Sequence, residues 1–237
     1  ADQARRVGLE YRATLARARR VSSKFNRDFE NWVAMIHDLA SGAEAWSSHP
    51  SWIEFATNNR CNLRCVMCSQ PGDPSLAMEP DDARALLADL LPGATVITPS
   101  SNSEPLLADI ELVLEQCRKH DVYLDLYTNG TLLTPERFAA MAERVYRLHL
   151  SFDSHVPEVY ERVRVGASYA TVVDHLRGIQ GIATERGVPV EFVLVMMAEN
   201  TPTLAEYVDF IADLGGPQVR VQALENQSPA YEILDVR

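Results

Sequence analysis

The residues best suited to chemistry in this chain are three cysteines in one short stretch. Cys61, Cys65 and Cys68 follow the spacing C-x3-C-x2-C, and the 237-residue chain has only one other cysteine, Cys117. Three thiolates are one ligand short of a closed tetrahedral zinc site, and the sequence nearby offers no obvious fourth. They do suit a cubane iron–sulfur cluster whose fourth iron stays open to bind a substrate or cofactor. The spacing therefore favours a catalytic cluster, with a structural metal site as the alternative.

The pattern of the chain from residue 50 onward predicts a scaffold for these cysteines. Short apolar runs alternate with helical periodicities, and this alternation indicates a parallel sheet covered by helices. The expected strands are 52–57, 94–99, 122–128, 146–152, 189–197 and 218–224, and the expected helices are 81–91, 105–119, 135–144, 169–186 and 202–214. Six such units fit an open doubly wound sheet or a partial barrel. Both folds place functional groups at the carboxyl ends of strands, and the cysteines follow the first strand.

The first part of the chain has a different pattern. Apolar residues recur at three- or four-residue spacing over most of residues 5–45, and Ser41-Gly42 is typical of a helix end. We therefore expect an N-terminal helical extension over residues 1–49 and one α/β domain over residues 50–237. Residues 1–30 hold eight Lys or Arg against four Asp or Glu, which we interpret as a solvated or barrel-docked basic helix rather than a partner or RNA site.

Composition narrows the functional class. The net charge of −11 argues against a broad nucleic-acid surface, which would normally be basic. No run approaches the roughly 20 apolar residues of a membrane span, and the first 30 residues lack the apolar core of a secretory signal. Clustered cysteines are typical of a metal or cofactor site in a cytoplasmic protein rather than of a secreted disulfide framework.

The run Cys61-Asn62-Leu63-Arg64-Cys65-Val66-Met67-Cys68 resembles the cluster motif of the radical S-adenosylmethionine (radical SAM) enzymes. The resemblance covers roughly residues 50–226. It implies a partial (β/α)6 TIM-like barrel and a [4Fe–4S] cluster held by the three cysteines. In that family the open iron chelates SAM, and an electron from the cluster cleaves SAM to methionine and a 5′-deoxyadenosyl radical. The radical then abstracts a hydrogen atom from a substrate.

The same resemblance assigns residues to SAM binding. Asn102-Ser103-Glu104-Pro105 is similar to the family's Gly-Gly-Glu-Pro turn, which binds the SAM amino group; here Asn102 and Ser103 replace the glycines while Glu104 keeps the carboxylate. The other implied contacts are Met67 against the adenine, Thr128 and Asn129 in a Thr-Asn-Gly turn, Ser151 and Asp153 in a Ser-x-Asp pattern, Arg164 on the SAM carboxylate, Asn200 near the ribose, and Ala223 on the last strand along the adenine.

Polar residues on the expected strands are candidates for contact with the substrate. A packed barrel interior is apolar, so the polar strand residues Glu54, Asp125, Tyr127, His149, Glu191 and Gln222 stand out. We predict that Asp125, Tyr127, His149 and Gln222 line the substrate cavity. His149 is included because it is in phase with Ser151 and Asp153 by the period of two of a strand.

These observations lead to one main hypothesis and two alternatives. The main hypothesis is a radical SAM enzyme that abstracts hydrogen from a small natural-product or sugar-like substrate and takes its electron from an external donor such as flavodoxin or ferredoxin. One alternative is an enzyme that modifies ribosomal peptides, related to the SPASM or twitch branch, with auxiliary clusters in a further C-terminal domain. The other is a non-catalytic iron–sulfur or zinc binding module. We expect no membrane association, and nucleic acid is not an expected partner.

Overall fold

The computed structural model describes residues 25–68, 77–100, 103–216 and 218–224. The expected helix over residues 5–24 and the proposed SAM contact Asn102 lie outside these residues, as do residues 225–237 of the expected α/β domain. No helix in the described part of the chain is long and apolar enough to cross a membrane.

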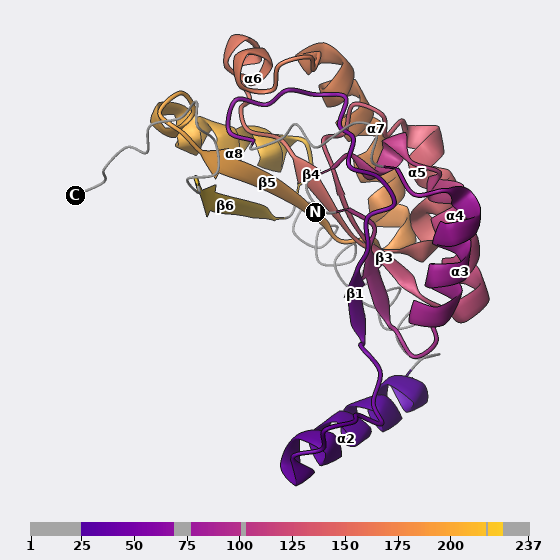
Figure 1. Cartoon of the computed structure of the whole chain (residues 1–237). Helices are drawn as coiled ribbons and strands as arrows, with labels where there is room; N and C mark the ends of the chain where they lie inside the picture. Colours follow the sequence, from indigo (N-terminus) through magenta and orange to yellow (C-terminus); the bar gives the residue numbers. More distant parts are fainter. Residues whose placement is uncertain (1–24, 69–76, 101–102, 217, 225–237) are drawn as a thin grey trace.

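Six parallel strands form one sheet in the order in which they occur in the chain (Figure 1). The strands are β1 (Trp52–Glu54), β2 (Val96–Thr98), β3 (Tyr123–Thr128), β4 (Val145–Ser151), β5 (Val190–Met196) and β6 (Val219–Ala223). Each strand pairs with the next, whereas β1 and β6 do not pair with each other. The sheet is therefore the open, partial barrel that the β–α alternation allowed, and the competing doubly wound order is absent.

Helices connect successive strands and cover the outer face of the sheet (Figure 1). They are α3 (Pro80–Leu90), α4 (Ile110–His120), α5 (Pro135–Met141), α6 (Pro157–Val163), α7 (Tyr169–Arg186) and α8 (Leu204–Asp213), with the short 3₁₀ helices η1 (Pro105–Leu107), η2 (Ala142–Arg144) and η3 (Thr201–Thr203). Side-chain caps begin several of them: Asp109 accepts from the Leu112 amide, Thr134 from the Arg137 amide and Ser168 from the Thr171 amide. These oxygens satisfy amides that have no partner inside the helix.

Most elements agree with the sequence analysis, and two differ. The expected helix 105–119 is broken after Leu107, because Asp109 caps a new helix at Ile110. The helix α6 was not predicted. It is only seven residues long and starts at Pro157, which is too short for helical periodicity to show.

The two faces of the sheet carry different residues. On β3, Leu124 and Leu126 are completely buried in the core under the helices, whereas Asp125 and Tyr127 line a pocket on the inner face. This alternation follows from the strand geometry, in which successive side chains point to opposite faces. The inner face of the sheet is therefore free to carry polar, functional groups.

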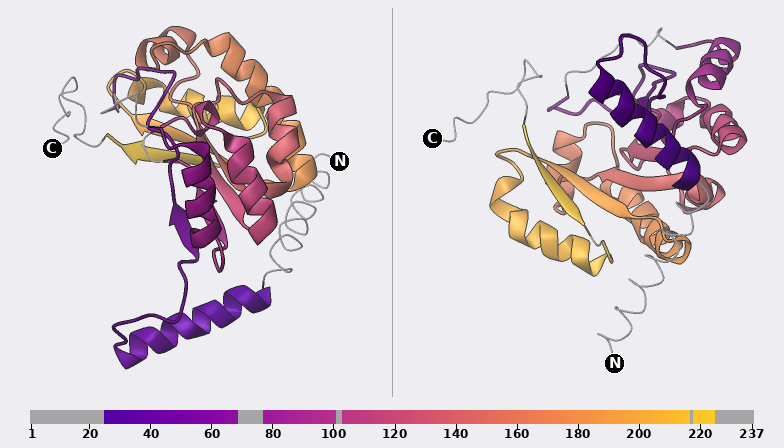
Figure 2. Two further views of the ribbon diagram at one scale, coloured as in Figure 1. Left: turned by 45° about the vertical axis from the view of Figure 1, so that its right-hand side comes forward. Right: turned by 90° about the horizontal axis from the view of Figure 1, so that it is seen from below.

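The helix α2 (Phe25–Ser41) lies apart from the other helices, below the sheet in Figure 1 and at the bottom left of Figure 2. It exposes five large apolar side chains, at Phe29, Trp32, Val33, Ile36 and Leu39. Asn31 joins it to the start of the α/β region by exchanging hydrogen bonds of 2.8 and 2.7 Å with the backbone of His49. The domain division at residue 49 stays a prediction.

Candidate functional site

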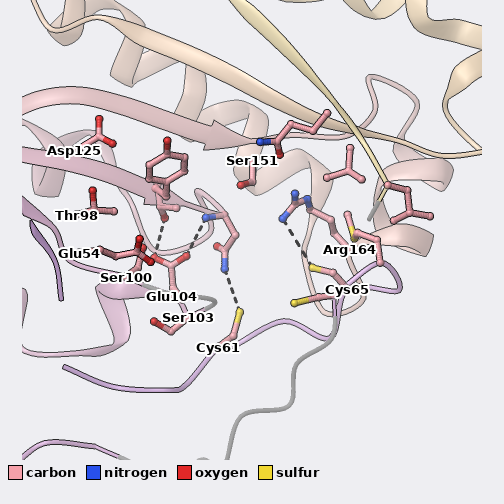
Figure 3. A pocket seen from close by; sticks show the side chains of 18 of the residues that line it. Glu54, Cys61, Cys65, Thr98, Ser100, Ser103, Glu104, Asp125, Ser151 and Arg164 are labelled. Atoms are coloured by element: carbon pink, nitrogen blue, oxygen red, sulfur yellow. Dashed lines mark hydrogen bonds between the residues drawn. The ribbon is translucent and has the colours of Figure 1, made fainter. Parts of the chain in front are cut away.

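A pocket of about 940 Å³ opens at the carboxyl ends of the strands (Figure 3). Its lining comes from the loop after β1, from the ends of all six strands, and from the segment after α6. The lining residues are Trp52, Glu54, Cys61, Cys65, Met67, Cys68, Thr98, Ser100, Ser103, Glu104, Asp125, Tyr127, Thr128, Asn129, Ser151, Arg164, Val195, Gln222, Ala223 and Leu224. The volume is near the upper end of the range for small-molecule sites, about 300–1,000 Å³.

The loop that carries the cysteines is held from two sides by backbone hydrogen bonds. The amides of Arg64 and Val66 donate to the carbonyls of Val165 and Val163, both at 2.9 Å, and the amide of Glu104 donates to the carbonyl of Arg60 at 2.8 Å. The segment that follows α6 therefore fixes the position of the cysteine loop. The nearby Gly166 has φ +98°, a conformation that side chains rarely adopt.

The three cysteines are half-buried and unpaired, and all three line the pocket. Burial raises the pKa of the Cys61 thiol, and Glu104 adds to the effect. Burial also raises the pKa of the Cys65 thiol, although the positive charge of Arg164 opposes it. Because iron binds thiolates, cluster assembly at these residues must release protons.

The donor set fits an iron–sulfur cluster better than a single metal ion. No group of three or more His, Cys, Asp or Glu side chains in the described ranges is arranged to hold one ion. In a [4Fe–4S] cluster each cysteine binds a different iron, so the sulfurs lie farther apart than the ligands of a single ion. The three cysteines line one pocket, and a cluster held by them would leave one iron without a protein ligand.

Glu104 is a buried carboxylate that caps η1 in the segment after β2, and three donors hold it. Its Oε1 accepts from the Thr128 hydroxyl at 2.8 Å and from the Leu106 amide at 3.2 Å, and its Oε2 accepts from the Asn129 amide at 2.9 Å. Burial raises the pKa of this carboxyl even though these hydrogen bonds favour its ionised form. Glu104 also lines the pocket, so one fixed acceptor group faces the space beside the cysteines.

The turn after β3 links that carboxylate to the cysteine loop. The Asn129 side chain donates to Asn62 Oδ1 at 2.9 Å and lies 3.9 Å from the Cys61 sulfur, and its Oδ1 accepts from the Thr131 amide at 2.9 Å. Gly130 has φ +77°, which allows the sharp turn. Thr128 and Asn129 therefore position Glu104 and Cys61 relative to each other.

On the other side of the pocket, Arg164 and Asp153 form a buried ion pair. Arg164 Nε lies 2.6 Å from Asp153 Oδ2, and Arg164 Nη1 lies 3.9 Å from the Cys65 sulfur. Burial alone lowers the pKa of Arg164, but the attraction of Asp153 and Cys65 raises it above its ordinary value. Arg164 therefore stays charged and borders the pocket next to a cysteine.

Two of the residues assigned to SAM contacts are not part of the pocket lining. Asp153 is completely buried; its second oxygen accepts from the Val195 amide at 2.7 Å. The Asn200 amide donates to the carbonyls of Asp153 and Val195, and its oxygen accepts from the Met197 amide at 2.8 Å. Both side chains are occupied in holding the ends of β4 and β5. A direct contact of either side chain with SAM stays a prediction.

Below the pocket lies a network of charged side chains from β3, β4, β5 and β6, buried except for Arg220, whose side chain is 34% exposed. His149 places Nε2 at 2.9 Å from Asp125 Oδ1 and Nδ1 at 2.7 Å from Glu191 Oε2. The side chain of Arg220 places Nη2 at 2.9 Å from Glu191 Oε2 and 3.3 Å from the Tyr127 hydroxyl. The Tyr127 ring stacks on His149 with 3.9 Å between ring centroids. Of these five, Asp125 and Tyr127 line the pocket.

The structure brings most of the sequence-predicted site residues together. The predicted residues in the lining are Cys61, Cys65, Cys68, Met67, Ser103, Glu104, Thr128, Asn129, Ser151, Arg164, Ala223, Asp125, Tyr127 and Gln222, while His149 lies directly beneath them. Their individual roles stay predictions.

The sequence analysis did not assign site roles to Thr98 and Ser100 at the end of β2, or to Arg220 on β6. The first two line the pocket and the third joins the network beneath it. The period of two along a strand is the signal that could have found them, since Arg220 is in phase with Gln222 and Thr98 with Ser100.

Comparison with known proteins is consistent with this geometry. Residues 56–214 match the sequence family described as the Radical SAM superfamily. Among curated relatives, GTP 3′,8-cyclase of Limosilactobacillus fermentum is 24% identical over 172 residues, which cover 68% of this chain and 51% of that protein. PqqA peptide cyclase of Streptomyces rochei is 25% identical over 178 residues, covering 73% of this chain and 48% of that protein. The chain thus spans about half the length of these relatives.

Solved structures show the same fold. Streptococcus suis SuiB bound to the precursor peptide SuiA superposes with a TM-score of 0.62 at 16% identity, covering 78% of this chain and 42% of SuiB. The structure of anSMEcpe with bound AdoMet gives a TM-score of 0.61 at 18% identity, covering 77% of this chain and 53% of that chain.

Proposed function

The chain belongs to the radical SAM superfamily, and we propose that it cleaves SAM reductively and uses the resulting radical to abstract a hydrogen atom from a small natural-product or sugar-like substrate. Members of the family are enzymes that use a [4Fe–4S] cluster and SAM. The observation that carries the proposal is the shared lining of one pocket: Cys61, Cys65 and Cys68 surround it together with Glu104 and Arg164.

The residues present suit this cofactor pair. Cys61, Cys65 and Cys68 would hold three irons, which leaves the fourth for the amino and carboxylate groups of SAM. When bound, the cluster supplies the electron that splits SAM into methionine and the 5′-deoxyadenosyl radical. Glu104 would accept from the SAM amino group, and Arg164 would pair with its carboxylate.

An unsatisfied polar atom supports a ligand at this place. The Ser103 hydroxyl oxygen is buried and has no hydrogen-bond partner within the described part of the chain, although Ser103 lines the pocket beside Glu104. Buried polar groups normally have partners, so an orphaned hydroxyl facing a pocket indicates a missing ligand or water. This supports the sequence prediction that Ser103 belongs to the SAM turn.

The charge of the pocket lining favours some of the substrate classes named for the relatives over others. A GTP substrate carries a triphosphate, which proteins usually bind with several Lys or Arg side chains. The described lining holds a single basic residue, Arg164, which is already assigned to the SAM carboxylate. The described residues therefore favour a substrate other than a nucleoside triphosphate.

A peptide substrate is the second candidate. PqqA peptide cyclase is among the relatives, and SuiB was solved with a precursor peptide. The pocket is large and extends to the edge strands β1 and β6, through Trp52, Gln222 and Leu224. A peptide segment entering between these edges would reach the space beside the cysteines.

The test is an anaerobic assay of SAM cleavage. The protein is reconstituted with iron and sulfide, reduced with dithionite and mixed with SAM, and 5′-deoxyadenosine is measured. The natural reductant would be an external donor such as flavodoxin or ferredoxin. We expect 5′-deoxyadenosine from the wild type and background levels from Cys65→Ala, whose cluster has lost one ligand. No product from a wild-type protein with full iron content would overturn the proposal and favour a binding module.

A further inference from the structure

We propose that Asp125 binds an ammonium group of the substrate, with Glu54 on the same side of the pocket, and that His149, Glu191 and Arg220 hold Asp125 in place. The inference rests on the proposed function and narrows its substrate class to molecules with a protonated primary amine. It follows from the side chains of the pocket that the assignment to the cluster and SAM leaves unused.

Asp125 is a buried carboxylate with unused hydrogen-bonding capacity. It is 2% exposed and lines the pocket. Its Oδ1 lies 2.9 Å from His149 Nε2, whereas no hydrogen bond within the described ranges involves its Oδ2. A carboxylate oxygen that borders a cavity can accept hydrogen bonds from a ligand or water that enters it. Because Asp125 lines the pocket, a ligand with a donor group can supply them.

The neighbours of Asp125 form one connected network beneath the pocket. Both nitrogens of the His149 ring face carboxylate oxygens, at 2.7 Å for Glu191 and 2.9 Å for Asp125. Arg220 Nη2 lies 2.9 Å from Glu191 Oε2 and 3.1 Å from His149 Nδ1, so Arg220, Glu191 and His149 form one connected group next to Asp125. The second oxygen of Asp125 is left to the pocket.

The position of Asp125 is fixed by packing as well as by charge. Tyr127 stacks on His149 with an interplanar angle of 5°, so the imidazole cannot turn away from Asp125. The Arg220 guanidinium carbon lies 5.7 Å from the centroid of the Tyr127 ring and closes the stack from β6. His149, Glu191 and Arg220 are thus positioning residues that act through Asp125 and Tyr127.

The negative charge of the pocket lining favours a positively charged group on the ligand. Glu54, Glu104 and Asp125 supply three carboxylates to the described lining, against the single basic residue Arg164. In Figure 3, Glu54, Thr98 and Asp125 come from neighbouring strands and lie on one side of the view, away from Arg164 and Cys65. This side of the pocket attracts a cation and repels phosphate or carboxylate groups. A primary ammonium also donates the short, charge-assisted hydrogen bonds that a free carboxylate oxygen accepts best.

The test measures binding of amines to the reconstituted protein saturated with SAM, by ligand-observed NMR titration. The probes are glucosamine, 2-deoxystreptamine and Nα-acetyl-lysine methylamide, each compared with its N-acetylated, uncharged form. We expect at least one ammonium probe to bind about tenfold or more tightly than its acetylated form, as a charge-assisted hydrogen bond would give. Comparison of the aminated ring compounds with the lysine derivative distinguishes a small metabolite from a peptide side chain.

Three variants test whether the preference depends on Asp125. Asp125→Asn should abolish the difference between each amine and its acetylated form. Asp174→Asn makes the same change on the exposed outer side of α7 and should keep the difference. Glu191→Gln should reduce the preference for the ammonium form while leaving the affinity for the acetylated form unchanged. A purely structural role of Glu191 would weaken binding of both forms alike.

Three results would overturn the inference: equal binding of amines and acetylated forms, a preference that persists in Asp125→Asn, or, in a parallel titration without SAM, an ammonium preference that is lost when SAM is added. The last would show that these carboxylates belong to the SAM site. If the wild type cleaves SAM but shows no ammonium preference, the inference fails and the proposed function stands. If an ammonium preference is found without SAM cleavage, the proposed function fails instead.

Discussion

Two sets of charged side chains, each with a member in the pocket lining, differ in which hydrogen-bonding atoms they leave without a partner. In the Asp153–Arg164 pair, one oxygen of Asp153 accepts from Arg164 and the other from the Val195 amide. In the network of Asp125, His149, Glu191 and Arg220, Asp125 Oδ2 has no described hydrogen bond, and Arg220 Nε is buried without a partner within the described ranges.

This difference in hydrogen bonding gives the two carboxylates different roles. Asp153 supports another side chain, whereas Asp125 can bind a ligand. Both oxygens of Asp153 accept from protein donors, and one of these bonds holds Arg164 beside Cys65. The network leaves donor and acceptor capacity next to a cavity, which only a ligand or water can use. The carboxylates of Asp153 and Asp125 are alike in charge and burial. They differ in the number of hydrogen bonds that their oxygens accept.

The largest effect on stability is expected from breaking the satisfied pair. Asp153→Asn leaves the Arg164 charge buried without its counter-ion, and we expect a loss of about 3–5 kcal/mol in the free energy of unfolding. Urea denaturation of the metal-free protein measures it. The double variant Asp153→Asn with Arg164→Met should regain part of the loss, because it no longer buries an unpaired charge. A loss below about 1 kcal/mol would show that the pair is solvated.

A smaller loss is expected when the network loses its central member. His149→Phe keeps the ring that stacks on Tyr127 but removes both nitrogens, which leaves Asp125 without its described partner while Arg220 still pairs with Glu191. We expect about 2–3 kcal/mol, the cost of one buried charged group that loses its hydrogen bond. The same denaturation experiment measures it. A loss of unfolding free energy equal to that of Asp153→Asn would show that the network and the satisfied pair do not differ in their contribution to stability.

Glu104 lies between the two cases, because both its oxygens accept hydrogen bonds and yet it lines the pocket. Burial raises the pKa of its carboxyl above the ordinary 4.5, so folding disfavours the ionised form. The stabilising contribution of Glu104 is therefore greatest below pH 4.5 and falls as the pH rises through the raised value. The difference in unfolding free energy between wild type and Glu104→Gln, measured across this range, should shift in favour of the variant as the pH rises. A shift in the opposite direction would show that the hydrogen bonds outweigh burial.

The smallest effect is expected at an exposed ion pair, which serves as the reference. Arg84 Nη1 lies 2.7 Å from Glu115 Oε2, yet the two side chains are 45% and 60% exposed. Glu115→Gln should cost less than about 1 kcal/mol, because water screens the pair and both groups stay hydrated. A larger cost in the same denaturation experiment would mean that short distance, rather than burial, controls these energies.

Much of the pocket's rim was predictable because its residues are close in sequence or follow strand ends. The spacing of Cys61, Cys65 and Cys68 and the turn at Thr128-Asn129-Gly130 depend on local backbone geometry, which a short run of residues determines. The order of strands and helices was predictable for the same reason, since periodicity reports which face of an element is buried. The seven-residue α6 lay below the length at which periodicity shows.

The sequence by itself determined the element order, the cysteine loop and the polar residues that stand out on apolar strands. Only the tertiary structure decided which of those polar residues face one another. His149 meets Asp125 from β3 and Glu191 from β5, 24 and 42 residues away along the chain. It also decided that Asp153 and Asn200 are occupied by backbone partners, while Asp125 has an oxygen to spare. The physical reason is that strand register and sheet curvature set these contacts, and both depend on the packing of the whole domain rather than on any local run of residues.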